Sequence, residues 1–163
     1  MKRCLSPRPR GYPLMELRPI DEDKKNIEAV IRAFFEAGKT KDLATLADFH
    51  ATRDKFTKFD ENPPYTRQDS EQAFVHEQAA FANISDYDYR IDELRVDLLG
   101  EAAICTFYLI YGGIFVNDYS FEGSPVSSRV RVTMVLAKTG NGWKIAHEHL
   151  SRFPDWKASE LAR

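Results

Sequence analysis

The chain has 163 residues, of which 43% are hydrophobic and 29% are charged, a composition typical of one soluble globular domain. Its 23 basic and 25 acidic residues give a formal net charge of −2, which provides no net attraction to nucleic acid or to anionic lipid. No stretch of the sequence approaches the roughly 18 uninterrupted apolar residues of a spanning helix. We therefore expect a cytoplasmic protein without a nucleic-acid or membrane partner.

Both ends of the chain predict tails around a single domain. Residues 1–20 are rich in basic residues and proline and have no apolar periodicity, which indicates a flexible basic tail. Met15 begins a more regular sequence, so we hypothesise that it is the natural start, although a genuine basic tail fits the sequence equally well. We expect the domain over residues 21–154 and a C-terminal tail over residues 155–163.

The two cysteines have no evident disulfide partner. Cys4 lies in the basic tail, whereas Cys105 lies inside an apolar run. Apolar surroundings raise the pKa of a thiol, so we expect Cys105 to be inert and to serve as core packing.

Helices are expected in the first half of the domain. From Asp21, a natural N-cap, to Gly38, apolar residues recur at intervals of three and four, which places them on one stripe. The stripe consists of Ile27, Val30, Ile31 and Phe34. A short second helix is expected to turn Leu43, Leu46 and Ala47 inward.

A short strand and a third helix follow. Residues 56–59 alternate like a strand, and the prolines at 63 and 64 then force a loop. The third helix is expected from about Asp69 to Asn83. Its inward face would carry Ala73, Phe74, Glu77 and Phe81, with His76 to one side.

After Asp86 the sequence predicts strands. The inward residues change parity near Asp92 and Glu93, which predicts a β-bulge. Residues 102–111 are apolar at nearly every position, which is typical of a central strand buried on both faces. Residues 126–138 and 143–151 form a hairpin around a glycine-rich turn. Helices followed by antiparallel strands indicate an α+β fold.

The closing hairpin carries the side chains most suited to chemistry. Arg129 and Arg131 share one face of its first strand, where they fit either a solvent-facing surface or a pocket lining. On the second strand His147 and His149 point the same way, about 7 Å apart. A metal site needs a third ligand and Glu148 points to the opposite face, so we favour structural histidines over metal ligands. A single pocket histidine acting as acid or base is a further possibility.

Other parts of the chain offer fewer candidates. The sequence contains no glycine-rich phosphate loop that opens a helix and no serine elbow. Tyr108 and Tyr111 lie on opposite faces of the expected central strand, so one of them can present its hydroxyl to a pocket. Core packing is the simpler role for both tyrosines.

The closing run 141–151, preceded by Arg131-Val132-Thr133, resembles the closing hairpin of SnoaL-like proteins of the nuclear transport factor 2-like superfamily. The resemblance is nearest to the branch that contains the association domain of calcium/calmodulin-dependent kinase II, and residues 56–60 and 98–103 also fit that branch. It covers about residues 21–154. It implies a cone-shaped α+β fold, in which a curved antiparallel sheet wraps a long helix and leaves a pocket. It also implies dimers that form through the outer sheet face.

The resemblance further implies which residues line the pocket. Arg131 matches an arginine of the association-domain pocket, and His76 matches a pocket histidine, whereas leucines stand in place of the other pocket arginines. The resemblance also places Glu148 inward, which would make Arg131 and Glu148 a paired polar centre. His147 and His149 would then face the convex side. The alternative of two pocket histidines stays open.

These observations lead us to expect a homodimeric protein that binds a small molecule in an apolar pocket centred on Arg131. If the protein is an enzyme, the resemblance implies a cofactor-independent isomerase, cyclase or hydratase, with Glu148 or a histidine as base and Arg131 stabilising an oxyanion. We expect no metal and no cofactor. The expected ligand-binding residues are His76, Tyr108, Tyr111, Arg131 and His149. The alternative function is a non-enzymatic assembly module that uses its outer sheet face.

Overall fold

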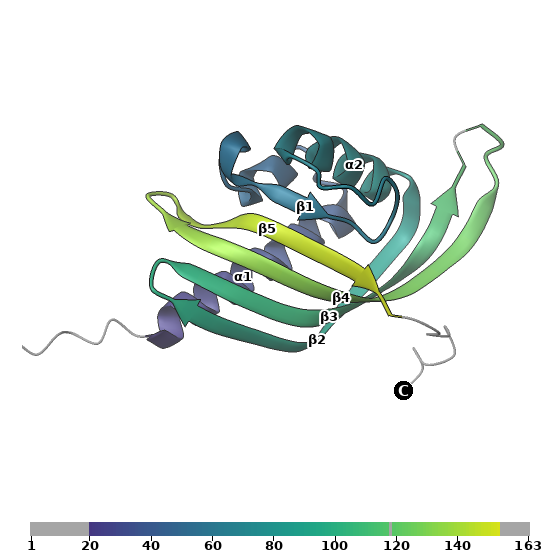
Figure 1. Cartoon of the computed structure of the whole chain (residues 1–163). Coiled ribbons are helices and arrows are strands. Elements are labelled where there is room, and N and C mark those ends of the chain that lie inside the picture. Colours follow the sequence, from purple (N-terminus) through teal and green to yellow (C-terminus); the bar gives the residue numbers. More distant parts are fainter. Residues whose placement is uncertain (1–19, 118, 154–163) are drawn as a thin grey trace, which may run out of the picture.

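The computed structural model describes residues 20–117 and 119–153, in which helices and a five-stranded sheet form two layers (Figure 1). Both predicted tails lie outside the described residues, except for Ile20. Cys4 also lies outside them. None of the described helices is long and apolar enough to cross a membrane. The elements are α1 (Ile20–Thr40), the 3₁₀ turns η1 (Leu46–Phe49) and η2 (Arg53–Lys55), β1 (Thr57–Phe59), α2 (Ser70–Ala82), β2 (Ile84–Leu99), β3 (Ala102–Val116), β4 (Gly123–Thr139) and β5 (Gly142–Arg152).

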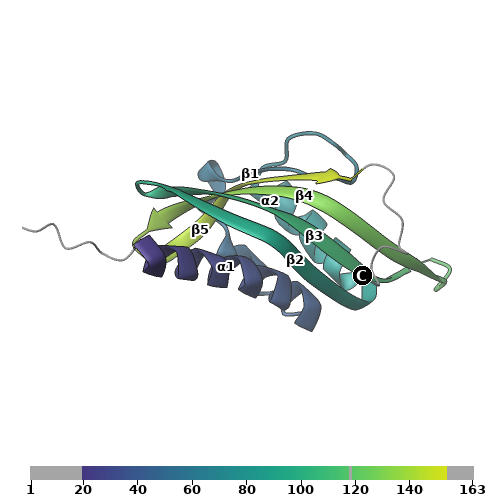
Figure 2. The same ribbon diagram turned by 90° about the horizontal axis from the view of Figure 1, so that it is seen from below.

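The sheet confirms the predicted α+β fold. Its strand order is β1-β5-β4-β3-β2, and all neighbours are antiparallel except β1, which runs parallel to β5. The four long strands curve around α1, which lies across their concave face (Figure 2). The edge strand β1 brings an early segment of the chain beside the last strand, close to α2.

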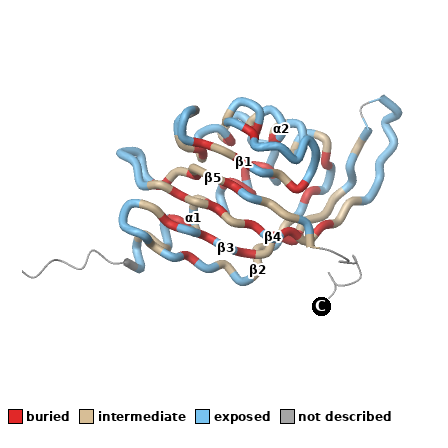
Figure 3. The backbone as a smooth tube through the Cα atoms, in the orientation of Figure 1, coloured by how far each residue is buried: buried red, intermediate tan, exposed pale blue. Residues whose placement is uncertain are grey.

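Helix α1 packs on the sheet through the predicted stripe. Ile27, Ile31 and Phe34 are buried, and Val30 is half-buried. The helix begins at Ile20, so Asp21 lies in the first turn instead of at the N-cap, where its charge still complements the helix dipole. Buried residues alternate with more exposed ones along the long strands (Figure 3), and the buried residues of the strands and of α1 form one hydrophobic core.

Helix α2 is also positioned as the sequence predicts. Asp69 caps its first turn and forms a capping box with Gln72. Of the predicted inward residues, Ala73 and Glu77 are buried, while Phe74 and Phe81 are half-buried. The expected short second helix is instead the two 3₁₀ turns, in which Leu46 is buried but Ala47 is exposed.

Three register shifts interrupt the pairing of the strands, and one of them lies between Ser85 and Asp88 of β2. The predicted bulge is confirmed, because the pairing of β2 with β3 slips between Asp92 and Arg95, and Glu93 has a φ of 55°. The shift between Val135 and Leu136 of β4 changes which residues of β5 face inward. Beyond it, Glu148 and Leu150 join the inner face.

Strand β3 is central, between β2 and β4, but the prediction that both its faces are buried is wrong. Alternate residues such as Cys105 and Leu109 are buried towards α1, whereas Thr106 is exposed and Ile104 is 38% exposed. The reason is that α1 packs on the opposite face only. Burial raises the pKa of the Cys105 thiol to about 12, as expected of an inert packing residue.

Candidate functional site

A pocket of about 300 Å³ lies between the helices and the concave face of the sheet. Its walls are mostly aromatic and apolar, and its deepest part is charged. The wall residues include Phe34, Phe35, Phe81, Tyr87 and Leu109, the deep charged residues are Lys58, Glu77 and Glu148, and the more accessible polar residues include Asp60, Asn62 and His76. An apolar cavity with a few convergent polar groups is the usual form of a small-molecule site.

Lys58 lies at the centre of the charged group. Strand alternation places it on the same side of β1 as Phe56, which is 1% exposed, and the parallel pairing sets Lys58 beside Glu148 of β5. Its Nζ donates a hydrogen bond to Oε1 of Glu77 at 2.8 Å. The same Nζ lies 3.2 Å from Oε2 of Glu148 and 3.4 Å from Oδ2 of Asp60. Three carboxylates therefore surround one buried ammonium group.

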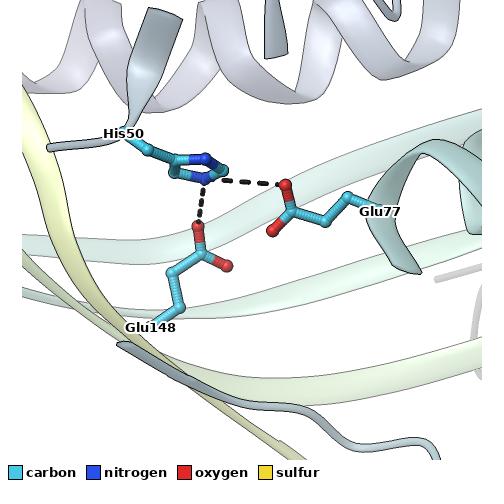
Figure 4. A group of neighbouring side chains, drawn as sticks. All are labelled: His50, Glu77 and Glu148. Atoms are coloured by element: carbon cyan, nitrogen blue, oxygen red, sulfur yellow. Dashed lines mark hydrogen bonds and ion pairs between the residues drawn. The ribbon is translucent and has the colours of Figure 1, made fainter. Parts of the chain in front are cut away.

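His50 completes the cluster and contacts both glutamates (Figure 4). It follows η1 and is held in place because the backbone N–H of Ala51 donates to the carbonyl of Ile145. Its Nε2 lies 3.3 Å from Oε1 of Glu148 and 3.6 Å from Oε2 of Glu77. The imidazole ring packs on Phe56, with the ring centroids 4.3 Å apart. A proton on Nε2 therefore faces both glutamates.

The two glutamates differ in their affinity for protons. Burial alone would raise the pKa of Glu148, but the Lys58 charge and the His50 hydrogen bond outweigh burial and bring the pKa to about 2. Burial raises the pKa of Glu77, and together with the negative charge of Glu148 it outweighs the lowering by the Lys58 charge. Glu148 is therefore the ionised carboxylate of the cluster, and Glu77 is the one that takes up a proton more readily.

The two basic groups of the cluster hold their protons firmly. Burial lowers the pKa of Lys58, but the surrounding carboxylates outweigh burial and raise the pKa above its ordinary value. The pKa of His50 is also raised, since the attraction of Glu148 and Glu77 exceeds the effect of burial. Lys58 is thus a fixed cation and not a nucleophilic amine.

The same residues resemble a metal-ligand set but fit a metal poorly. His50, Glu77 and Glu148 offer ligand atoms that lie within 4.8 Å of one another. The Lys58 ammonium, however, already contacts both glutamates, and a divalent cation between them would meet its positive charge at close range. The carboxylates are therefore arranged around an ammonium group.

Glu61, a carboxylate outside the Lys58 cluster, fixes the accessible side of the pocket. Tyr111 donates its hydroxyl to Oε1 of Glu61 at 2.8 Å, and Ser128 and Arg152 donate to Oε2 at 3.3 and 3.1 Å. These bonds attach the segment that follows β1 to β3, β4 and β5. They hold Asp60 and the neighbouring pocket residues in a defined position.

Comparison with known proteins identifies the family. Residues 27–155 match the model of the SnoaL-like domain, which is most of the chain. The chain belongs to the SnoaL-like domain family. Its fold is that of the nuclear transport factor 2-like superfamily, as the sequence resemblance predicts. No curated protein matches the chain.

Solved structures share this SnoaL-like fold at low sequence identity. A nuclear transport factor 2-like superfamily protein from Salmonella enterica has a TM-score of 0.71 at 18% identity, covering 87% of this chain and 99% of its own. A protein of the same superfamily from Streptomyces avermitilis, provisionally named a dehydratase, has a TM-score of 0.68 at 21% identity, covering 83% and 99%. The association domain of the Caenorhabditis elegans calcium/calmodulin-dependent kinase II has a TM-score of 0.63 at 18% identity, covering 80% and 96%.

The structure brings three of the predicted site residues to the pocket of this SnoaL-like domain. Glu148 lies in its deep part, and Tyr111 lies on its wall. His76 lines the accessible side, with its Nδ1 3.2 Å from Oε1 of Gln68. These placements agree with the expectation that Glu148, Tyr111 and His76 face the pocket.

The prediction that Arg131 lines the pocket is wrong. Arg131 is exposed on the convex face, opposite Tyr108 of β3 and Ser151 of β5. The reason lies in the register of the hairpin: Val132 stands opposite Leu150, so the pairing that turns Leu150 inward turns Arg131 outward. The pocket is therefore centred on Lys58, and not on an arginine.

Two further predicted ligand residues also lie on the convex face. The Tyr108 ring is covered by the Arg129 guanidinium, 4.5 Å from the ring centroid. His149 is exposed and packs beside Phe59. His147 contacts the Thr57 hydroxyl on the same face, with its Nδ1 2.9 Å from Oγ1. The convex placement of both histidines is thus confirmed, and the alternative of two pocket histidines is wrong.

Sequence analysis missed Lys58, His50 and Asp60 as site residues and gave Glu77 no chemical role. Two of them carry a signal: Lys58 shares strand parity with the apolar Phe56, and Glu77 interrupts the inward stripe of a helix. A charged residue at an inward position is an indication of a paired or functional group. His50 and Asp60 lie in irregular segments, where no periodicity indicates which way a side chain points.

Proposed function

We propose that this SnoaL-like protein binds a small, flat and largely apolar molecule and moves a proton between that molecule and Glu77. The observation that carries the proposal is the state of Glu77: its side chain is buried in the pocket wall, its pKa is raised, and its Oε2 has no hydrogen-bond partner in the described part of the chain. A carboxyl group with these properties suits general acid–base catalysis near neutral pH.

The other residues of the cluster support this role without taking part in bond breaking. Lys58 holds the Glu77 carboxyl group in place, and Glu148 in turn holds Lys58, because the Lys58 ammonium contacts both glutamates. The aromatic wall suits a ring-shaped substrate and excludes water from the proton being moved. The reaction class that fits best is proton removal from carbon beside a carbonyl group, as in a cofactor-independent isomerase or dehydratase. The provisional dehydratase name of the Streptomyces avermitilis protein is compatible with that class.

The test uses 5-nitrobenzisoxazole, a probe that needs only a base in an apolar pocket. The Glu77 carboxylate would take the proton from C3, the N–O bond would break, and the yellow 2-cyano-4-nitrophenolate would be released and measured by absorbance. Glu77→Gln is expected to lower kcat/KM about 100-fold or more, because an amide cannot accept the proton.

Two variants serve as references for this experiment. Glu77→Asp keeps the carboxyl group on a shorter side chain and should retain part of the activity. Glu101→Gln changes an exposed carboxylate in the β2–β3 turn and should leave kcat/KM unchanged. A rate for Glu77→Gln within twofold of the wild-type rate, in protein with a native circular dichroism spectrum, would rule out Glu77 as the base.

We also propose that the protein is a homodimer that associates through the convex face of the sheet. Ile104 and Phe59 are each 38% exposed there, and a stack of Tyr108, Arg129 and Phe153 adds aromatic surface. Exposed apolar side chains gathered on one face favour association. The exposed apolar side chains of the same face also support the alternative function, a non-enzymatic assembly module. Cytoplasmic location stays a prediction.

Light scattering after size-exclusion chromatography tests the association. The wild-type protein is expected at the mass of two chains, and Ile104→Glu is expected at the mass of one, because it places a charge in the apolar contact. Val75→Glu changes another exposed apolar residue, on α2, and should remain a dimer. A wild-type monomer, or dissociation caused by Val75→Glu and not by Ile104→Glu, would exclude the proposed interface. Loss of association without loss of probe turnover would separate assembly from catalysis.

A further inference from the structure

Three tyrosines pack together on the inner face of β2 and β3, and they differ in what their hydroxyl groups contact. The ring centroid of Tyr87 lies 6.1 Å from that of Tyr89 and 6.0 Å from that of Tyr111. Tyr89 donates its hydroxyl to the carbonyl of Arg32, and Tyr111 donates its hydroxyl to Glu61. Tyr87 is the most buried of the three, with 7% exposure, but its hydroxyl has no hydrogen-bond partner among the described residues. Buried polar groups are nearly always paired, so an unpaired hydroxyl at this depth needs an explanation.

A bulge at the start of β2 turns Tyr87 towards the pocket. The pairing with β3 slips between Ser85 and Asp88, and Asp86, inside the slip, has a φ of 51°. Gly113 of β3 allows the bulge to come close, since a Cβ at that position would lie 2.7 Å from the carbonyl oxygen of Ser85. Bulges re-aim side chains within a sheet. Here the result is that Tyr87 is one of the residues that line the pocket.

The Tyr87 side chain borders the same aromatic wall as Glu77. Its ring centroid lies 5.3 Å from that of Phe81, with the two ring planes at 75°. Phe81 follows Glu77 by four residues on α2, which places both side chains on one face of the helix. All three residues line the pocket. A flat molecule that packs on the Phe81 ring would therefore lie near both polar groups.

The Tyr87 hydroxyl is suited to donate a hydrogen bond and not to lose its proton. Burial raises the pKa of this hydroxyl above the ordinary value of a tyrosine, and the negative charges of Asp88 and Glu61 add to that effect. The hydroxyl therefore stays protonated near neutral pH and offers its O–H to an acceptor. The same negative charges disfavour an anion beside Tyr87. The matching acceptor is an uncharged oxygen atom, such as that of a ketone or an aldehyde.

We propose that the Tyr87 hydroxyl binds the carbonyl oxygen of the ligand, and that the pocket selects uncharged planar ketones or aldehydes over carboxylates. The inference deepens the proposed function and rests on its apolar pocket ligand, but it does not need Glu77 to act as a base. Proton removal from carbon beside a carbonyl group requires that the carbonyl oxygen be held by a donor. The bond would also give a partner to the one hydroxyl of the three tyrosines that lacks a partner in the described chain.

NMR titrations of the full chain with three naphthalene derivatives test the proposal. 2-Acetylnaphthalene carries the ketone, 2-isopropenylnaphthalene replaces the ketone oxygen by a CH₂ group of similar shape, and 2-naphthoate carries a carboxylate. Tyr87→Phe is expected to raise the Kd of the ketone about tenfold, because the carbonyl oxygen is then buried without a donor. The Kd of the isopropenyl compound should change by less than about twofold, since this compound accepts no hydrogen bond. The wild-type protein should bind 2-naphthoate about tenfold more weakly than the ketone.

Tyr89→Phe is the matched control, since Tyr89 belongs to the same group of tyrosines but does not line the pocket. It should leave the Kd of the ketone within about twofold of the wild-type value. Urea titration adds a readout that separates ligand binding from a structural role. Tyr111→Phe should lower the urea midpoint because it removes the bond to Glu61, whereas Tyr87→Phe should leave the midpoint unchanged or raise it.

An unchanged ketone Kd in Tyr87→Phe would overturn the proposal, since the hydroxyl would then face only water. Equal effects of Tyr87→Phe on the ketone and on the isopropenyl compound, tighter binding of 2-naphthoate than of the ketone, or no measurable ketone binding to the wild-type protein would overturn it as well. These readouts do not use turnover. If Tyr87→Phe weakens ketone binding while Glu77→Gln leaves probe turnover unchanged, the proposed function fails alone. The reverse pattern would keep Glu77 as the base and remove Tyr87 as the ligand-binding donor.

Discussion

Lys58→Met is expected to destabilise the folded protein by about 3–5 kcal/mol at pH 7, because it leaves the buried Glu77 and Glu148 carboxyl groups facing each other without their shared cation. Methionine has nearly the same length as lysine, so the change removes the charge with little loss of packing. The free energy of unfolding is measured by urea titration. The decrease in the free energy of unfolding should be smaller at pH 4.5, because the unpaired carboxyl groups are more readily protonated at that pH.

A matched control separates burial from charge alone. Lys39 forms an ion pair with Asp88 at 2.7 Å, but both side chains are well exposed, and Lys39→Met should leave the free energy of unfolding almost unchanged. Equal small losses for the two variants would show that water reaches the Lys58 cluster. A triple variant in which Glu77 and Glu148 are also replaced by leucine is expected to recover much of the stability, since apolar residues tolerate burial better than ion pairs do.

Glu148→Gln is expected to remove most of the acid sensitivity of the fold. The pKa of Glu148 is about 2 in the folded protein against 4.5 for the unperturbed group. A carboxyl group with a lowered pKa stabilises the fold fully above its unfolded pKa, and the stabilisation is lost as the pH falls through 4.5 towards 2. For Glu148 the wild-type loss over this range amounts to about 3 kcal/mol. Urea midpoints measured from pH 7 to pH 2 give the profile.

Glu77 acts in the opposite sense and must be considered in the same experiment. Its raised pKa means that protonation stabilises the fold below the unfolded pKa, and that this stabilisation is lost as the pH rises through the folded pKa. Glu148→Gln should therefore be less stable than wild type at pH 7 but should change little between pH 4.5 and 2. Glu101→Gln should keep the wild-type profile. If the stability of wild type and of Glu148→Gln falls equally steeply as the pH is lowered, other carboxyl groups cause the acid sensitivity.

The fold could be predicted because its periodicities are strong. The stripe of α1, the inward face of α2 and the parity change near Glu93 are local patterns, and each corresponds to the observed packing. The register shift at Val135 could not be predicted. It lies within an otherwise regular alternation, and only the pairing of β4 with β5 reveals it.

The centre of the site could not be predicted, because it depends on contacts between distant segments. The family resemblance assigns Arg131 to the pocket, although the alternation of β4 places Arg131 on the face opposite to the apolar Val130 and Val132. The inward parity of Glu148, by contrast, was predicted correctly. Its cation, Lys58, comes from a three-residue strand that is too short for a periodic pattern to identify.

The parallel pairing of β1 with β5 has a consequence for synthesis on the ribosome. Thr57 to Phe59 leave the exit tunnel long before their strand partners, His147 to His149. Until then Lys58 and Glu77 have neither the Glu148 carboxylate nor a neighbouring strand to bury them. A nascent chain that stops before β5 therefore lacks a closed sheet edge and a complete charge cluster, so the domain can reach its native state only after β5 has been synthesised.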